Sequence, residues 1–309
     1  MQHKEIYIIG FGAIGKALAA FLTAQGRRVR VIRGSVNDGS RAQEDIVIDL
    51  ADGATLRQST EVVTLKSVGK TDGPVILATK SYGNKELALA LKSKSENSPI
   101  VLLQNGLNIE KPFLDNGFSQ IYRCVLFATG LALDNGLVRF RSVANSPAGL
   151  IKGDIATLNE VVEQINTPYF RFETQKDIQT VIWKKAIMNV VFNSVCPLLE
   201  TDNGIFNRDA SALRLAGQII KSCTAIAGKA GIRLNPQEIE TGLLHISKAS
   251  DGQLISTLQD INNGRRTEID TLNFQIAEIA EKNKMTIEAQ QILLLGELIK
   301  IKEKINLTI

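Results

Sequence analysis

Cysteine, histidine and long apolar runs are scarce in this chain, and each shortage excludes a class of protein. Three cysteines occur among 309 residues and none is in a C-x-x-C pair, so no disulfide framework is expected for Cys124, Cys196 and Cys223. Two histidines leave no histidine-based metal site. No apolar run approaches the roughly 20 residues that cross a bilayer, and no signal peptide is visible, so we expect a cytoplasmic protein.

The charge balance is also weak, which argues against a polyanionic partner. The net charge is +4, with 44% hydrophobic and 22% charged residues, an ordinary globular composition that excludes a disordered chain. The positive excess is too small and too scattered for nucleic-acid binding. It would suit an anionic cofactor or substrate, but solubility is the preferred explanation. We therefore expect a small-molecule partner, with no nucleic acid and no membrane, and either a monomer or a homodimer.

The first half of the chain alternates short apolar runs with helical patterns. This β-α-β alternation predicts a parallel, doubly wound sheet. An Asn-Gly pair at Asn135-Gly136 between apolar flanks predicts an antiparallel hairpin across 131–138 at the far edge of that sheet. Strands are expected at 6–9, 29–32, 75–79 and 100–103, and helices at 13–25 and about 85–91.

Beyond about residue 177 the strand signals stop and only helical patterns remain. We predict a Rossmann-type dinucleotide-binding α/β domain over 1–176 and an all-helical substrate domain over 177–309. Asn235 before Pro236 and Thr267 before Glu268 predict helix N-caps, Glu268 being the first residue of its helix, and Gly231 predicts a helix end. The expected helices are 182–195, 210–231, 237–248, 268–282 and 288–304.

A glycine-rich run between the first strand and the first helix predicts a dinucleotide site. The first glycine permits a tight turn, the second lets a pyrophosphate approach the backbone, and the third allows close packing of helix on strand. The helix N-terminus adds free N–H groups and a positive dipole end. A ligand-free glycine turn is the alternative. The residues of this run are Gly10, Phe11, Gly12, Ala13, Ile14 and Gly15.

The end of the second strand indicates which dinucleotide is bound. NAD sites usually carry an acid there for the ribose 2′-hydroxyl, but here the strand ends with Arg33 and the first acid is Asp38. A guanidinium could hold a 2′-phosphate through two hydrogen bonds. An exposed arginine without a role is the alternative, but the missing acid favours NADPH.

A polar stripe on the first helix of the second half is a candidate chemical site. Lys185, Asn189 and Asn193 are spaced i, i+4, i+8 and so share one helix face. Asparagine is a poor helix former, and buried amides need partners or a ligand. Spacing alone does not separate this from buried structural polar residues. Thr79-Lys80 and Gln104-Asn105-Gly106 follow strands, where ligands of open α/β sheets bind, although ordinary turn chemistry would also explain them.

Together these motifs resemble those of the ketopantoate reductases, a branch of the 6-phosphogluconate-dehydrogenase-like group. The likeness covers nearly the whole chain. Its motifs are Gly10-x-Gly12-Ala13-Ile14-Gly15, Thr79-Lys80, Gln104-Asn105-Gly106, Trp183-x-Lys185-x-x-x-Asn189-x-x-x-Asn193, Asn203-Gly204, Ser256-x-x-Gln259-Asp260 and Thr267-Glu268-Ile269-Asp270.

The resemblance implies NADPH-dependent reduction of 2-dehydropantoate (ketopantoate) to pantoate, a step of pantothenate and coenzyme A biosynthesis. It implies that Lys185 is the general acid and that Glu268 supports the site. It also implies substrate binding by Asn105, Asn189, Asn193, Asn203 and Ser256, and cofactor contacts by Lys80 and Asn105.

The chain departs from the family pattern at three places, which leaves other substrates open. Gly83 stands where a glutamine or aspartate is frequent, 138–141 replaces a histidine-containing strand, and Ile287 replaces a common proline. A reductase of another small 2-keto acid or of an opine-like substrate is therefore the alternative. A non-catalytic dinucleotide-binding sensor is a third hypothesis, but it would not need Lys185 and Glu268 together.

Overall fold

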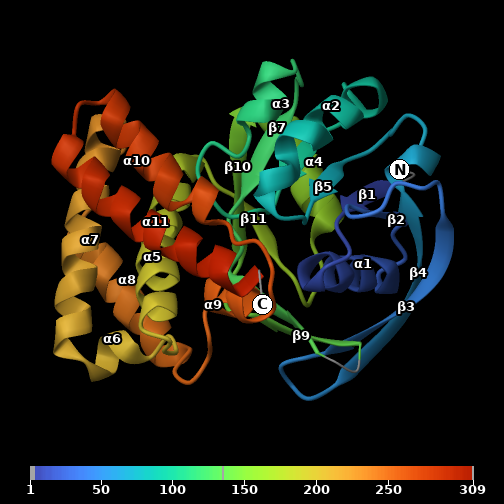
Figure 1. Cartoon of the computed structure of the whole chain (residues 1–309). Coiled ribbons are helices and arrows are strands. Elements are labelled where there is room, and N and C mark those ends of the chain that lie inside the picture. Colours follow the sequence, from blue (N-terminus) through green and yellow to red (C-terminus); the bar gives the residue numbers. More distant parts are fainter. Residues whose placement is uncertain (1–3, 134–135, 308–309) are drawn as a thin grey trace. The chain divides into compact units, whose positions relative to one another are not determined.

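The computed structural model describes residues 4–133 and 136–307, which fold into two compact units (Figure 1). The described residues within Met1–Gln104 and Ile109–Ile178 form the first unit. Those within Asn105–Asn108 and Gln179–Ile309 form the second. The short segment Asn105–Asn108 thus packs with the helical unit, although the chain around it belongs to the first.

The first unit is built on one mixed sheet. Among the described residues its strand order is β11-β10-β7-β6-β5-β1-β2-β4-β3-β9-β8, and β7-β6-β5-β1-β2-β4 is a continuous parallel stretch. The doubly wound parallel sheet is therefore confirmed at its centre. The strands are β1 (Ile6–Ile9), β2 (Val29–Arg33), β3 (Arg41–Asp49), β4 (Thr55–Thr64), β5 (Val75–Leu77), β6 (Ile100–Leu102), β7 (Ile121–Cys124), β8 (Ala128–Ala132), β9 (Leu137–Ser142), β10 (Ser146–Lys152) and β11 (Phe172–Thr174).

Alternating side chains of the central strand enter two separate cores. In β1, Ile6 and Ile8 pack with the apolar faces of α1 (Ala13–Ala24) and α4 (Ile155–Ile165), while Tyr7 and Ile9 pack with α2 (Asn84–Ser95) and α3 (Lys111–Asp115). Because strand side chains alternate between faces, a run of four apolar residues predicts burial on both sides. Short 3-10 turns, η1 (Leu65–Ser67) and η2 (Ser81–Gly83), complete the unit.

One predicted hairpin is confirmed and one long ribbon was not predicted. β8 pairs antiparallel with β9, and β8 is the edge strand of the sheet. Asp134 and Asn135 of its turn lie outside the described residues. β3 and β4 pair antiparallel over nine residue pairs, yet Arg41-Ala42-Gln43-Glu44-Asp45 has no apolar alternation that would indicate a strand. Pairing across the ribbon stabilises these residues in place of an apolar pattern.

The described residues of the second unit form helices and no strand, as the sequence predicts. The Asn235 side chain accepts a hydrogen bond from the Gln237 N–H, which confirms that N-cap, and Gly231 takes the left-handed conformation (φ +86°) after its helix. The elements are α5 (Ile178–Leu198), α6 (Ile205–Arg208), α7 (Ala210–Lys229), α8 (Pro236–Ala249), α9 (Ser256–Asn262), η3 (Ile269–Thr271), α10 (Asn273–Lys282) and α11 (Thr286–Leu307).

The predicted helix start at Glu268 is wrong. Glu268 precedes the three-residue turn η3, and the helix itself begins at Asn273. Thr267 is not an N-cap either, because its backbone N–H and hydroxyl both donate to the carboxylate of Glu303 on α11. A distant side chain satisfies the groups that a local cap would otherwise have satisfied.

Candidate functional site

The glycine-rich turn has the geometry that a dinucleotide needs. Gly10 has φ +119°, and a Cβ there would lie 2.8 Å from the carbonyl carbon of Ala78. A Cβ on Gly15 would lie 1.9 Å from the Gly10 carbonyl oxygen, so α1 can pack this closely on β1 only through glycine. A Cβ on Gly12 would meet nothing within 4 Å, and no side chain caps α1 there. The open backbone and uncapped N–H groups fit a pyrophosphate.

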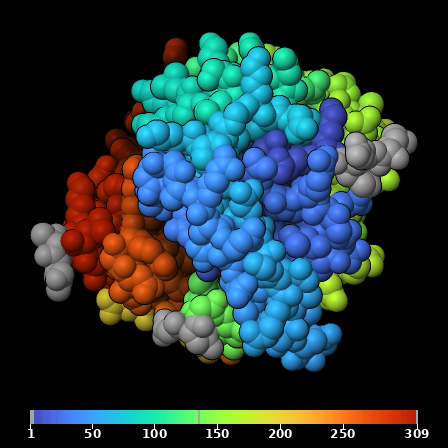
Figure 2. Space-filling model, turned by 90° about the vertical axis from the view of Figure 1, so that its right-hand side faces the viewer, coloured from blue at the N-terminus to red at the C-terminus, as the bar shows by residue number. Residues whose placement is uncertain are grey.

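Arg33 lies beside this turn and forms an ion pair that the sequence did not indicate. Its guanidinium carbon is 5.9 Å from the centre of the Phe11 ring, which belongs to the glycine run. Its Nη2 donates to the carboxylate of Glu44 on β3. Both side chains are about one-third exposed. The surface of the β2–β4 region is drawn in blue in Figure 2. The guanidinium therefore lies beside the glycine turn and is paired with a carboxylate.

The carboxyl ends of β1, β2 and β5 converge next to the turn. The Gly10 N–H donates to the Ile32 carbonyl, and a Cβ on Gly34 would lie 2.8 Å from the Thr79 methyl group. Lys80 follows Thr79 and is half-buried. The structure thus brings the predicted cofactor residues 10–15, Arg33 and Lys80 together at the carboxyl ends of the central strands.

Gln104 has a structural role in this edge rather than an open side chain. Its amide exchanges two hydrogen bonds with Asn84, at 2.9 and 2.7 Å, and also donates to the Thr79 hydroxyl at 3.1 Å. Asn84 in turn donates to the Ile109 carbonyl. This buried amide pair fixes the two chain ends from which the Asn105–Asn108 segment leaves.

The predicted polar face of α5 grades from half-buried to buried. Lys185 and Asn189 are half-buried, and Asn193 is 3% exposed. The Asn193 Oδ1 is buried without a hydrogen-bond partner among the described residues. Such an atom costs about 1–3 kcal/mol unless a ligand or water satisfies it. The neighbouring row of Ile182, Ala186 and Val190 is buried, as its spacing predicts.

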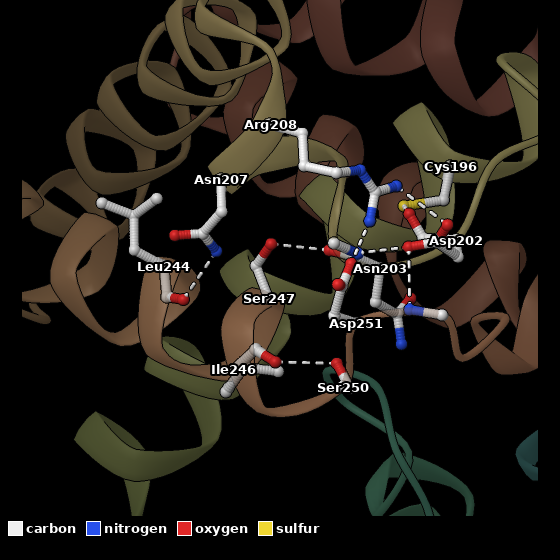
Figure 3. A network of polar contacts seen from close by, with 12 residues as sticks. Cys196, Asp202, Asn203, Asn207, Arg208, Leu244, Ile246, Ser247, Ser250 and Asp251 are labelled. Carbon is white, nitrogen blue, oxygen red and sulfur yellow. Dashed lines mark hydrogen bonds and ion pairs between the residues drawn. The ribbon is translucent and has the colours of Figure 1, made fainter.

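Asn203 lies in a polar network between α5, α6 and α8 (Figure 3). Its carbonyl accepts a hydrogen bond from the Ser247 hydroxyl at 2.7 Å, and its N–H donates to the Gln253 carbonyl. Its side-chain Oδ1 is buried without a hydrogen-bond partner among the described residues, as at Asn193. The backbone is therefore fixed while one amide oxygen is left to accept a hydrogen bond.

Asp202 holds the loop that carries Asn203. Its carboxylate accepts hydrogen bonds from the N–H groups of Gly204 and Gly252 and forms an ion pair of 2.8 Å with Arg208. Arg208 also pairs with Asp251 (Figure 3). The hydrogen bond from Arg208 lowers the pKa of the Asp202 carboxyl to about 2. None of these contacts was predicted, because the acids and the arginine are spread over 50 residues.

The Asn105 segment is bound to the turn that follows Glu268. The Leu107 N–H donates to the Thr271 carbonyl at 2.8 Å. Gly106, at φ +109°, lies so close that a Cβ would be 2.5 Å from the Thr271 hydroxyl oxygen. Thr271 donates back from its N–H and hydroxyl to the Glu268 carbonyl. The structure thus brings two segments together that are more than 160 residues apart and that each carry a predicted site residue.

Ser256 is exposed, unlike the predicted site residues on α5. It is the first residue of the short helix α9, and α9 has no side-chain cap. No cluster of three or more histidine, cysteine, aspartate or glutamate side chains that could hold a metal lies within the described residues. Within the same residues no helix is long and apolar enough to cross a membrane.

The first unit is an α/β sheet with a glycine-rich turn after its first strand, and the second unit is helical. This combination is the architecture of Rossmann-type oxidoreductases of the 6-phosphogluconate-dehydrogenase-like class. The family model described as ketopantoate reductase PanE/ApbA matches residues 6–146, and the model for the C-terminal part of the same family matches residues 177–303. The chain belongs to the ketopantoate reductase family.

Individual relatives agree with this membership. The chain is 29% identical over 304 residues to a 2-dehydropantoate 2-reductase of Pyrococcus horikoshii, covering 98% of each chain. Its fold is similar to that of D-mandelate dehydrogenase, solved with NADH and anilino(oxo)acetate (TM-score 0.82, 21% identity, 98% and 99% coverage). It is also similar to a dimeric ketopantoate reductase from Staphylococcus aureus (TM-score 0.81, 19% identity, 98% and 99% coverage).

Proposed function

We propose that the protein catalyses the NADPH-dependent reduction of 2-dehydropantoate to pantoate, a step towards coenzyme A. Support comes from the family membership and from the full-length relative of that name. The single observation on which the proposal rests is that the helical unit keeps Lys185 on the same α5 face as Asn189 and Asn193. A sensor that only bound a dinucleotide would need the glycine turn but not this face.

Lys185 is the proposed general acid. Bound NADPH would supply the hydride to the 2-keto carbon. Negative charge then develops on the carbonyl oxygen, and the Lys185 ammonium stabilises it and donates the proton that completes the hydroxyl. The products are a 2-hydroxy acid and NADP⁺. Glu268 is the proposed carboxylate that keeps Lys185 charged and oriented.

The unpaired amide oxygens support a substrate that carries a hydroxyl group. The Oδ1 atoms of Asn193 and Asn203 are buried acceptors without a hydrogen-bond partner among the described residues. A keto or carboxylate oxygen cannot donate to them, but an O–H group can. Ketopantoate has such a hydroxyl. Asn105, Asn189 and Ser256 are the other proposed substrate-binding residues.

For the cofactor, the glycine turn is proposed to hold the pyrophosphate, and Arg33 the 2′-phosphate. The missing acid at the end of β2 and the position of Arg33 beside Phe11 support NADPH over NADH. Lys80 and Asn105 are proposed to complete the cofactor site.

The deciding experiment measures NADPH and NADH oxidation with ketopantoate and with a panel of 2-keto acids, including aryl 2-keto acids. We expect the highest kcat/KM with NADPH and ketopantoate, and pantoate as the product. A preference for an aryl 2-keto acid would support the alternative that the D-mandelate dehydrogenase likeness suggests. NADPH binding without turnover of any keto acid would contradict the enzymatic proposal and favour the sensor.

A further inference from the structure

A buried carboxylate near the end of the chain is not explained by the proposed chemistry. Glu303 lies in the last turns of α11 and is 3% exposed. One of its oxygens, Oε2, accepts hydrogen bonds from both the N–H (2.8 Å) and the hydroxyl (2.5 Å) of Thr267. The other, Oε1, forms an ion pair of 2.9 Å with Lys300 one turn earlier.

Such a carboxylate is costly, so its partners must be specific. Removing an ionised group from water costs several kcal/mol unless charge-assisted hydrogen bonds replace the lost hydration. An apolar side chain at this position would contribute to the core without that cost. Burial alone would raise the pKa of the Glu303 carboxyl, but the bonds from Thr267 and Lys300 outweigh it and the pKa lies below its ordinary value. The group is thus ionised at neutral pH.

The contacts of α11 enclose Glu268 from both sides. Glu303 accepts a hydrogen bond from Thr267, the residue before Glu268. Lys300 forms an ion pair of 3.1 Å with Asp270, two residues after Glu268. Asp270 also accepts a hydrogen bond of 2.9 Å from Arg266. The chain on both sides of Glu268 is therefore held by Lys300 and Glu303 of α11, through Asp270 and Thr267.

The same chain of contacts continues to the Asn105 segment. The Glu268 carbonyl accepts the Thr271 N–H and hydroxyl, and the Thr271 carbonyl accepts the Leu107 N–H. Movement at Thr267 would therefore be transmitted across Glu268 to the backbone next to Asn105. All of these residues belong to the second unit.

We propose that Glu303 is a positioning residue, which sets the place of the Glu268 carboxylate and, through Thr271, of the Asn105 segment. This assignment rests on the proposed function of Glu268 and Asn105. Glu303 itself touches neither substrate nor cofactor in this scheme. Its effect on turnover passes through the backbone of 267–271.

The kinetic test compares Glu303→Gln with Glu297→Gln, an exposed glutamate on the same helix. The glutamine keeps a hydrogen-bond acceptor but loses the charge that orders Thr267 and Lys300. We expect kcat to fall about 10- to 100-fold, as for a small displacement of a catalytic group. The rates of Glu297→Gln should not change.

A double-mutant cycle separates positioning from general destabilisation. In a Glu268→Gln background, Glu303→Gln should lower kcat by a smaller factor than in the wild type, because one of the two groups that it positions is already disabled. Independent effects of the two substitutions on kcat, or a lower melting temperature with unchanged kcat in the Glu303→Gln single variant, would overturn the proposal.

Hydrogen exchange provides a test that does not need activity. Glu303→Gln should accelerate amide exchange in peptides covering 266–271 and 105–108, with little change in α7 or in the first unit. Unchanged exchange at 105–108 would refute the coupling even in an inactive protein. If the wild-type protein reduces no 2-keto acid but Glu303→Gln still accelerates exchange in both segments, the proposed function is refuted and the coupling is not.

Discussion

The Leu107 N–H and the Thr271 carbonyl form a 2.8 Å hydrogen bond that joins the segment after β6 to the turn after Glu268. The segments that carry two proposed site residues, Asn105 and Glu268, are thereby hydrogen-bonded to each other. The close approach depends on Gly106, whose conformation (φ +109°) and missing Cβ leave room for Thr271. The junction can therefore be tested without touching either functional side chain.

Gly106→Ala should weaken keto-acid binding and lower stability. The alanine Cβ would lie 2.5 Å from the Thr271 hydroxyl oxygen, in a conformation that costs about 1–3 kcal/mol for a side chain. We expect a higher KM for the keto acid and a lower melting temperature. Gly117→Ala is the control, since it has φ +80° but nothing within 4 Å of the added Cβ. Equal effects of the two substitutions on KM would exclude a specific role for the junction.

Lys185→Ala should reduce kcat by about 10²- to 10⁴-fold, the range for loss of a general acid, with NADPH binding retained. Stopped-flow hydride transfer and NADPH titration measure the two effects separately. Lys184→Ala is the matched control, because its ammonium instead pairs with Glu238 on α8 at 2.9 Å. Normal turnover of Lys185→Ala would remove this lysine from the mechanism.

Arg33→Ala should weaken NADPH binding about 10- to 100-fold and leave NADH binding nearly unchanged. A charge-assisted hydrogen bond to a phosphate is worth about 1.5–3 kcal/mol, and only NADPH carries the 2′-phosphate. Fluorescence titration with both dinucleotides measures the ratio. Arg30→Ala, which removes an arginine of β2 that pairs with Glu5 and Glu61, should affect neither. Equal losses for NADPH and NADH would contradict the assignment.

Glu44→Gln should strengthen NADPH binding by up to about fivefold. The carboxylate occupies the Arg33 guanidinium and would repel a 2′-phosphate, but an exposed ion pair is worth only about 0–1 kcal/mol. NADH affinity should stay the same in the same titration. Glu61→Gln provides a comparison carboxylate on β4. Weaker NADPH binding in Glu44→Gln would mean instead that Glu44 orients Arg33 for the phosphate.

Asp202→Asn should lower stability at neutral pH, and the loss should shrink in acid. The pKa of Asp202 falls from 3.8 to about 2 in the folded protein, chiefly through the hydrogen bond from Arg208. A carboxyl with a lowered pKa stabilises the fold above its ordinary pKa, and that contribution disappears as the pH falls from 3.8 towards 2. Melting temperatures of wild type and variant should therefore converge over that range. A constant difference at every pH would exclude the ion pair as the cause.

Local patterns were sufficient where the physical constraint is local. The glycine spacing predicted the turn at 10–15 because Gly10 and Gly15 each lie too close to neighbouring backbone atoms for a Cβ. The apolar row of Ile182 and Ala186 predicted the buried side of α5. By contrast, β3 was missed because its polar residues are stabilised by pairing with β4 rather than by an apolar pattern.

Local patterns failed where a distant side chain satisfies the backbone. Thr267 followed by Glu268 resembles a helix N-cap, but Glu303, 36 residues away, accepts both of the Thr267 hydrogen bonds, and the helix starts only at Asn273. Glu303 itself lies in an Ile-Lys-Ile-Lys-Glu-Lys run, which has the composition of a solvated helix face.

The sequence by itself determined the class of fold, the dinucleotide turn and the order of the candidate site residues, because periodicity and glycine spacing act over a few residues. Only the tertiary structure decided which partners those residues have. Glu44 forms an ion pair with Arg33, Thr271 packs against Gly106, and Glu303 accepts hydrogen bonds from Thr267. Hydrogen bonds and ion pairs between distant segments depend on how whole elements pack. The local sequence therefore does not distinguish a carboxylate that is hydrogen-bonded to water from one that is hydrogen-bonded to a buried N–H group.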